Sequence, residues 1–528
     1  MFSGVRATDQ RSRTLLLSAA VLTLSVLILT VNTQFFDSNF FAMTGAQSIL
    51  SGELPFRDYF DPGIPLAAFT AAGMQWLTGP RVIGEFLRQW AFIVAGVVVA
   101  FQLGLQLSRS VAAAWLLLPV TLFLLANEPT YHYGKLFFFP VMIWAGWRYL
   151  DRPGPLRAAV MGVISAAGFL ERHDFGIYLG FASVVALLLA PAAVPSSRTP
   201  RALFRDAAAY AGGVLVLMAP WMAVVQWSEG LVNYARARSE LSQGRHPVYA
   251  DLFRLEILTG LLHWRLPSRE LVAEWLERMV LLLPVALIVS AVAAIVRASR
   301  KAEPVPVDVW KRVLAALFLA AVGEGLMRQA TYVVVIFPVS AALASVFLVS
   351  PSATVRVLTG VLVAITTLLQ GMAIARSPLL HPSGYAEEMT DAFERLTVSP
   401  PVPSVERFEY IRQCTRPTDH ILVTGNNPLD VSYFSQRPIA GGQINWHRSW
   451  MSDPGHEQLA LALIQKVSVP MVVAHDIAAM KDFAAYPRIA AYLREHYREV
   501  EGTKGEILVD GRRQVTGRFE STGYPCFN

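Results

Sequence analysis

Repeated long apolar runs constrain this chain more than any other feature. The segment 15–31, LLLSAAVLTLSVLILTV, is almost entirely aliphatic, and similar stretches recur along most of the sequence. A helix needs about 20 apolar residues to cross a hydrocarbon layer of ~30 Å. Hydrophobic residues make up 54% of the chain and charged residues 16%, which argues against an ordinary soluble protein. The sequence therefore predicts a polytopic α-helical membrane protein.

The runs divide into about eleven transmembrane helices, each close to the length that a bilayer requires. They are expected at about 14–32, 86–107, 110–127, 136–150, 156–171, 175–192, 206–226, 279–296, 312–324, 332–350 and 354–376. The first run is expected to be retained as a span, because it is longer than the apolar part of a signal peptide and no small-residue cleavage site follows it. An odd number of spans places the two termini on opposite sides.

Basic residues orient these spans. Those in short loops on the N-terminal side are Arg6, Arg11, Arg13, Arg109, Arg148, Arg152, Arg157, Arg198, Arg201, Arg205, Arg297, Arg300, Lys301, Lys311, Arg312 and Arg356. The alternate short loops contain fewer, so the positive-inside rule predicts a cytoplasmic N-terminus and an extracytoplasmic C-terminus in the inner (plasma) membrane. This clustering explains the net charge of +6 better than nucleic-acid binding does.

The composition changes near residue 377. We expect a transmembrane domain over 1–376 and a small extracytoplasmic α/β domain over 377–528. Short buried strands are predicted at 420–425, 470–476 and 505–510, with helices near 404–414, 457–467 and 478–495. Two outward loops are long, 33–85 and 227–278. The first carries two short segments, 38–50 and 64–79, that we interpret as helices lying along the membrane surface.

The two cysteines, Cys414 and Cys526, both follow the last apolar run. Their spacing fits neither a zinc site nor a redox CxxC motif. A free pair and a single disulfide both remain open.

Ionisable residues at the predicted outer ends of the spans are candidates for function, because charges at membrane depth are costly. They are Asp37, Asp58, Asp61, Glu128, His132, Lys135, Glu171, Arg172, His173, Asp174, Glu324 and Arg328. Groups drawn from four outward loops on one membrane face could converge in a single cavity.

The first outward loop has a recognisable order of residues. It contains an acid just after the first span, a glycine after a short helix, a Pro-aromatic-Arg-Asp segment, a second acid before a Pro-Leu pair, and a glycine near the next span. These are Asp37, Gly52, Pro55-Phe56-Arg57-Asp58, Asp61 with Pro65-Leu66, and Gly79. This order resembles the first outer loop of GT-C glycosyltransferases, the group with protein O-mannosyltransferases and aminoarabinose transferases. The span count, the outward α/β tail and the segment 328–338, RQATYVVVIFP, are also similar.

The resemblance implies a GT-C-like fold and an inverting transferase that moves a sugar from a polyprenyl-phosphate donor to a hydroxyl on a lipid, glycan or protein acceptor. It implies that Asp37 is the general base, a role that suits a carboxylate facing a hydroxyl and an oxocarbenium-like transition state. The alternative is that Asp37 only caps a helix, and one residue can do both.

Two further acids match the family's pattern. Asp61 corresponds to the second acid of the loop, which in some relatives contributes to a metal or acceptor site. However, this chain lacks the charged pair that usually precedes the prolines, so a divalent metal remains an open expectation. Asp61-Pro62-Gly63 is also a good turn sequence. Glu128 lies where relatives often place another outer-loop acid, although a carboxylate in a solvated loop needs no function.

The donor's phosphate requires cations, and arginine offers a bidentate fork for phosphate oxygens. The family commonly has Lys or Arg between the fifth and sixth spans, where this chain has Arg172 and His173. The alternative there is an internal charge network of Glu171, Arg172 and Asp174.

Two other cations have competing explanations. Lys135 could bind phosphate, but we favour a lysine that snorkels to the membrane interface. Arg328 resembles the family's donor-contacting segment beside Tyr332, and it could equally pair with Glu324 four residues earlier.

Other classes are less well supported. The sequence has no GxxxxGK[ST], GxSxG or HExxH motif. A non-enzymatic protein of glycan assembly or lipid-carrier transport is the main alternative, because it would use the same cations without cleaving the donor. A solute transporter is disfavoured, since the charged residues gather at the outer ends of the spans. The sugar and the acceptor remain undetermined.

Overall fold

The computed structural model describes residues 17–25, 37–55, 57–60, 63–127, 133–194, 199–228, 230–235, 269–327, 337–374, 386–387, 390–391, 393–394, 397, 406–424, 429–443, 446, 452–474 and 483–528. The chain divides into two compact units. The helical unit comprises Met1–Gln34, Gln89–Pro220 and Tyr249–Ala392. The mixed unit comprises Phe35–Arg88, Trp221–Val248 and Phe393–Asn528.

Every predicted span after the first coincides with a helix, in whole or in large part. These helices are α4 (Val82–Ser108), α5 (Val111–Asn127), α6 (Gly134–Asp151), α7 (Pro155–Glu171), α8 (His173–Ala193), α9 (Pro200–Ser228), α12 (Arg269–Arg300), α13 (Val307–Met327), α14 (Phe337–Leu348) and α15 (Ala353–Ile374). Within the described residues, four helical segments are long and apolar enough to cross a membrane by length and composition, namely Val82–Ser108, His173–Ala193, Pro200–Ser228 and Leu283–Arg300.

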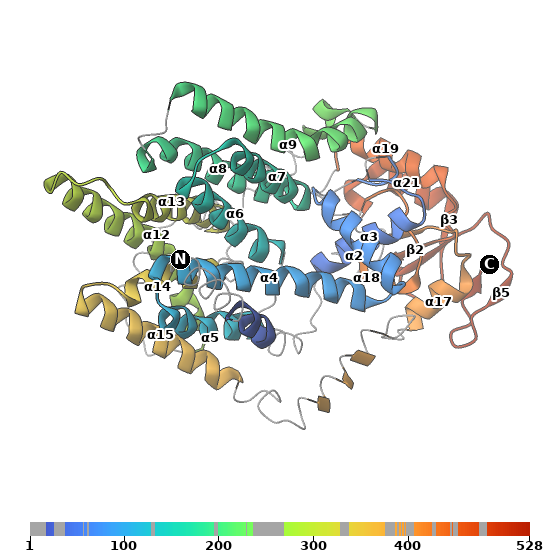
Figure 1. Cartoon of the computed structure of the whole chain (residues 1–528). Coiled ribbons are helices and arrows are strands. Elements are labelled where there is room, and N and C mark those ends of the chain that lie inside the picture. Colours follow the sequence, from blue (N-terminus) through green and yellow to red (C-terminus); the bar gives the residue numbers. More distant parts are fainter. Residues whose placement is uncertain are drawn as a thin grey trace. The chain divides into compact units, whose positions relative to one another are not determined.

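Within the helical unit, α6, α7, α8 and α13 pack side by side (Figure 1), and residues of α4, α5 and α14 complete the same core. Glycines allow some of its backbones to come unusually close. A Cβ at Gly162 of α7 would lie 2.2 Å from the carbonyl oxygen of Tyr210 in α9. A Cβ at Gly96 of α4 would lie 2.0 Å from the carbonyl oxygen of Leu136 in α6. Small residues at helix contacts are typical of membrane proteins, because helices in lipid associate through close van der Waals contact rather than through the hydrophobic effect.

The C-terminal part of the mixed unit is a small α/β fold. A four-stranded sheet has the order β1-β2-β4-β3, in which β1 and β2 are parallel and the other pairs are antiparallel. Its strands are β1 (Ile421–Thr424), β2 (Met471–Ala474), β3 (Tyr497–Glu499) and β4 (Ile507–Asp510). Around it lie α17 (Glu406–Cys414), α18 (Leu429–Ser435), α19 (Pro454–Lys466), η6 (Phe483–Ala485), α21 (Pro487–His496), β5 (Gly517–Arg518) and β6 (Pro525–Cys526). The three predicted strands are confirmed.

The first outward loop folds with this α/β part, a placement that the expected division at residue 377 does not anticipate. Its helices are α2 (Asp37–Leu50) and α3 (Pro65–Thr78). Thr44 donates to the carbonyl oxygen of Leu429 over 3.2 Å, and the Phe60 N–H donates to that of Gly442 over 2.8 Å. Gly442 has a φ of +68°, and a Cβ there would lie 3.1 Å from the carbonyl oxygen of Asp58. Glycine at this position therefore permits both the turn and the backbone contact.

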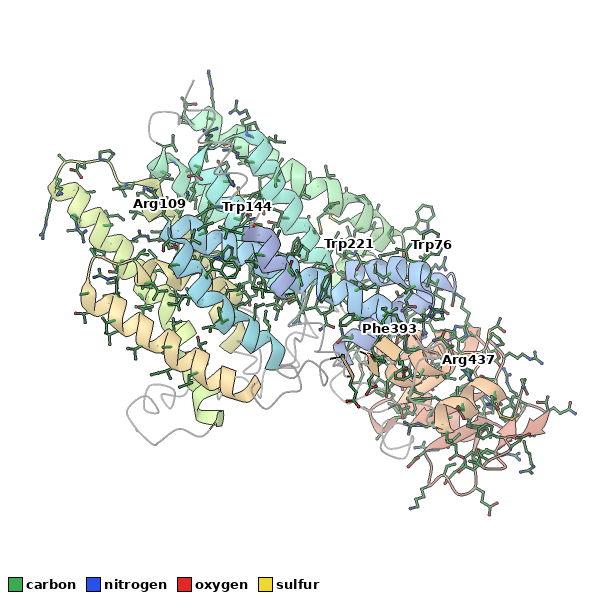
Figure 2. The ribbon with its side chains drawn as sticks, turned by 60° about the horizontal axis from the view of Figure 1, so that its bottom comes forward. Trp76, Arg109, Trp144, Trp221, Phe393 and Arg437 are labelled. Carbon is green, nitrogen blue, oxygen red and sulfur yellow. A yellow bond between two sulfur atoms is a disulfide. The ribbon has the colours of Figure 1, made fainter. Side chains whose placement is uncertain are left out.

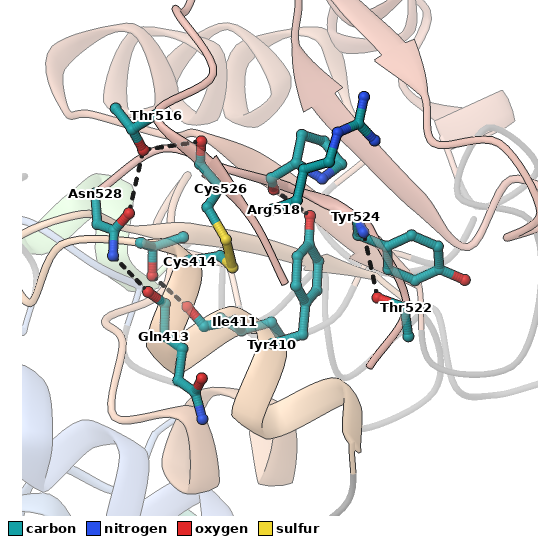
Figure 3. The surroundings of a disulfide bond; sticks show 12 residues. Tyr410, Ile411, Gln413, Cys414, Thr516, Arg518, Thr522, Tyr524, Cys526 and Asn528 are labelled. Carbon is teal, nitrogen blue, oxygen red and sulfur yellow. Dashed lines mark hydrogen bonds between the residues drawn. A yellow bond between two sulfur atoms is a disulfide. The ribbon is translucent and has the colours of Figure 1, made fainter. Parts of the chain in front are cut away.

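Cys414 and Cys526 form a disulfide (Figure 3), which decides between the two alternatives left by the sequence. The bond joins α17 to β6 across 112 residues of chain, with a Cα–Cα distance of 4.2 Å. The Phe527 N–H donates to the Cys414 carbonyl oxygen over 2.8 Å, and the Tyr410 hydroxyl donates to that of Pro525 over 2.8 Å. The C-terminal segment is thus fixed by covalent and hydrogen bonds together.

Candidate functional site

Three of the seven predicted site residues have described side chains: Lys135, Arg172 and His173. Asp37 is the first residue of α2, and its side chain is outside the described part, so its roles as a cap and as the general base stay predictions. Asp61, Glu128 and Arg328 lie outside the described residues, so their roles stay predictions.

Lys135 and Arg172 meet at one aromatic ring. Lys135 Nζ lies 5.4 Å from the centroid of the Phe175 ring, and the Arg172 guanidinium carbon lies 5.7 Å from it. Lys135 comes from the first turn of α6, whereas Arg172 separates α7 from α8. The side chain of Lys135 is only 2% exposed. The interpretation of Lys135 as a snorkelling lysine is therefore wrong, because its ammonium group is enclosed by protein.

Acidic side chains also belong to this part of the helical unit. Arg172 Nε forms an ion pair with Asp174 Oδ1 over 2.8 Å, so part of the expected charge network exists. Glu171, 6% exposed, packs against the start of α6. A Cβ at Gly134 would lie 3.2 Å from Glu171 Cγ and 3.3 Å from the Phe175 ring. Glycine at 134 thus leaves room for the Glu171 side chain and the Phe175 ring beside the start of α6.

The ion pair does not use the whole guanidinium. Arg172 Nη1 is buried, and no group in the described part of the chain accepts a hydrogen bond from it. The helices α6 and α8 also begin here, and neither has a side-chain N-cap hydrogen bond. Helix N-termini carry partial positive charge and free N–H groups. We call this group the Lys135–Arg172 cluster; it consists of Lys135, Glu171, Arg172, Asp174 and Phe175. Its two cations and two helix N-termini suit an anion such as phosphate.

His173 differs from its neighbour. Its ring stacks on Phe169 with a centroid distance of 4.3 Å and an interplanar angle of 22°. This stacking places the His173 ring against Phe169 of α7. Direct phosphate binding by His173 stays a prediction.

A buried polar network supports α2, and the sequence analysis did not identify it. Arg88 forms two hydrogen bonds with Glu85, of 2.9 Å and 3.0 Å, within the first turns of α4. Asn39 of α2 donates to Glu85 over 2.9 Å, and Arg88 Nη1 donates to Thr70 of α3 over 3.3 Å. The exposures of Asn39, Glu85 and Arg88 are 1%, 1% and 6%. The signal in the sequence is an acid and an arginine three residues apart at the start of an apolar helix.

Asp58 of the Pro-aromatic-Arg-Asp segment has a structural role. Its carboxylate accepts hydrogen bonds from Arg57 Nε over 2.7 Å and from the Leu54 N–H over 3.0 Å, and Lys466 of α19 lies 3.4 Å away. Partial burial alone would raise the pKa of Asp58, but these hydrogen bonds and the charge of Arg57 outweigh burial and lower the pKa below 3.8. Asp58 therefore stabilises the turn between Leu54 and Asp58 and connects it to α19 of the α/β part.

The helix α3 presents an apolar face to solvent. Phe69, Trp76 and Leu77 are 47%, 76% and 68% exposed, and Trp76 projects away from the fold (Figure 2). Aromatic and aliphatic side chains of this kind suit a membrane interface. The expected surface position of this helix stays a prediction that this face favours.

No metal centre is formed by the described residues, since they contain no group of three or more His, Cys, Asp or Glu placed to hold an ion. Asp61, the residue for which a metal role was considered, is outside that part of the chain.

The solved structures to which this chain is similar include two of one protein. They are crystal structures of ArnT from Cupriavidus metallidurans, bound to undecaprenyl phosphate and in the apo state. Both are 14% identical to this chain, with TM-scores of 0.44 and 0.45. The likenesses cover 94% and 95% of this chain and 97% and 98% of those chains. No family model matches the sequence, and no curated protein matches it. Both TM-scores are below 0.5, so these likenesses assign no role to any residue of this chain.

Proposed function

We propose that this protein is a GT-C-type glycosyltransferase that moves a sugar from a polyprenyl-phosphate donor to a hydroxyl acceptor, with inversion, on the outer face of the plasma membrane. The observation that carries the proposal is the pair of cations at the N-termini of two helices, the buried Lys135 and the partly buried Arg172. The buried Nη1 of Arg172, which has no acceptor in the described part of the chain, is matched to the phosphate that such a donor releases.

The reaction divides into two roles for the chain. Asp37, by the family resemblance, accepts the proton of the acceptor hydroxyl as its oxygen attacks the anomeric carbon. The bond between that carbon and the phosphate oxygen breaks, and the electron pair leaves with the phosphate. Lys135 and Arg172 stabilise the negative charge that develops on this leaving group.

The outward orientation has independent support. Disulfides form and persist in oxidising compartments and are rare in the cytoplasm. The bond between Cys414 and Cys526 therefore favours an extracytoplasmic α/β part, in agreement with the distribution of basic residues.

The test is transfer of a labelled sugar from a polyprenyl-phosphate donor by the purified full-length protein in detergent or nanodiscs. We expect Asp37→Asn to abolish transfer while the melting temperature is unchanged. Arg172→Gln should remove charged hydrogen bonds worth about 1.5–3 kcal/mol, and so reduce kcat/KM about 10- to 150-fold.

Arg201→Gln is the matched control, because Arg201 is an exposed arginine of α9. Wild-type turnover in Asp37→Asn would refute the role of the base. Movement of labelled lipid across the bilayer without cleavage of the sugar–phosphate bond would instead establish the alternative, a lipid-carrier transport protein.

A further inference from the structure

A large apolar cavity lies within the helical unit, away from the Lys135–Arg172 cluster. Its volume is about 750 Å³, within the range of about 300–1,000 Å³ that ligand pockets occupy. Helices α4, α5, α12, α13, α14 and α15 line it, and α14 packs against both α12 and α15 (Figure 1). The wall is formed mainly by Ala, Val and Leu side chains.

The charged groups that line the cavity lie at one end. Arg297 near the end of α12, Arg312 near the start of α13, and Ser350 and Pro351 between α14 and α15 lie there. Leu283, also of α12, marks the apolar end, about 20 Å from Arg297 at the rise of an α-helix. The cavity is therefore long, with cations at one end and an aliphatic wall along its length.

Neither arginine forms an ion pair with an Asp or Glu of the described part of the chain. No Asp or Glu is among the described residues that line the cavity. Asp308, one turn before Arg312, instead pairs with Arg109 over 2.6 Å and with Lys311 over 3.5 Å. Arg312 Nε is buried, and no group in the described part of the chain accepts a hydrogen bond from it. This end of the cavity thus carries two positive charges that face no carboxylate within the cavity lining described, and the nearby Asp308 is shared with Arg109 and Lys311.

We propose that the cavity binds one anionic phospholipid of the surrounding bilayer, with its phosphate at Arg297 and Arg312 and an acyl chain along the aliphatic wall. Three properties select this occupant. The charges complement a phosphate, and the apolar length suits an acyl chain. Exposed side chains of the wall, Val289 of α12 and Leu358 of α15, are 62% and 64% exposed and leave a lateral entry from lipid.

The predicted topology agrees with this assignment. Arg297 and Arg312 belong to the basic clusters that the positive-inside rule places on the cytoplasmic side. The cytoplasmic leaflet is rich in anionic lipids, and basic pockets between transmembrane helices on that side bind their head groups. The site is thus separate from the outward-facing reaction proposed above, and it does not depend on it.

The experiment measures binding of phosphatidylglycerol and of phosphatidylcholine to the purified full-length protein, by native mass spectrometry and by thermal stabilisation. We expect phosphatidylglycerol to bind and stabilise the wild type, and phosphatidylcholine to bind much more weakly. The double variant Arg297→Gln/Arg312→Gln should lose about 30-fold in affinity for phosphatidylglycerol, from about a factor of five for each cation.

Two further variants separate the explanations. Arg300→Gln removes an exposed cation from the same helix outside the cavity, and it should bind like the wild type. Ala293→Phe keeps every charge but places a ring at an exposed position of the wall, and it should weaken binding. Equal binding of both lipids, an unchanged affinity in the double variant, or binding of polyprenyl phosphate in preference to phosphatidylglycerol would overturn the proposal.

Discussion

The buried ion pair between Glu85 and Arg88 provides the sharpest test of how the first outward loop is held. Arg88→Met removes two charge-assisted hydrogen bonds from a carboxylate that is 1% exposed. Loss of one partner of a buried ion pair costs about 3–5 kcal/mol, because the remaining charge keeps its desolvation penalty. We therefore expect Arg88→Met to destabilise the mixed unit by that amount, while the double variant Glu85→Leu/Arg88→Met recovers most of the loss.

The assay is thermal and denaturant unfolding of the purified protein, with a double-mutant cycle over Glu85 and Arg88. Arg81→Gln is the control, since Arg81 is an exposed arginine just before α4 and should change stability by less than about 0.5 kcal/mol. The sugar-transfer assay adds a second measurement, because Asn39 connects the ion pair to the helix that begins at Asp37. A loss below about 1 kcal/mol in Arg88→Met, or a double variant no better than the sum of the singles, would refute the reasoning.

Three other predictions concern single features. Gly134→Val should overpack Glu171 and cost about 1–3 kcal/mol of stability, measured by thermal unfolding, whereas an unchanged melting temperature would contradict the packing. Replacing Cys414 and Cys526 by serine should cost about 2–5 kcal/mol, and intact-mass analysis of the alkylated wild type should find no free thiol unless the protein is first reduced. Because the pKa of Asp58 is lowered, its contribution to stability is present above its unfolded pKa of about 4 and is lost as the pH falls through the folded value. Asp58→Asn should flatten the pH dependence of the melting temperature below about pH 5, and an unaltered pH profile would argue against the turn.

The secondary structure was predictable because local sequence carries it. Each apolar run has the length and composition of a membrane helix, and each buried β-branched segment has the pattern of a strand. Breaks in these patterns mark the ends. The short helix of the first loop ends at Leu50, two residues before Gly52, whose φ is +87°. Loop residues such as Asp61 lie where no such regularity constrains the chain.

Side-chain environments were not predictable, because partners distant in sequence decide them. Lys135 lies just before an apolar run, at the start of a helix, which is where a snorkelling lysine would also lie. Its burial comes from Phe175 and its neighbours, some 40 residues later, which are brought close by the packing of α6 against α8. The association of the first loop with the α/β part likewise depends on contacts such as that between Phe60 and Gly442, across nearly 400 residues.

The difference between an interfacial lysine and a buried lysine bears on which residues are functional. A lysine that reaches lipid headgroups needs no particular neighbours, whereas a buried lysine requires compensating groups, because burial of an unpaired charge is costly. Around Lys135 the chain supplies acids from the end of α7 and the start of α8, and it also supplies Arg172, a second cation. The acids leave Arg172 Nη1 without an acceptor in the described part of the chain, so a buried donor is still available to a ligand. An anion bound at the two helix N-termini would accept a hydrogen bond from Arg172 Nη1. The proposed function therefore rests on the phosphate of a lipid-linked donor as the ligand.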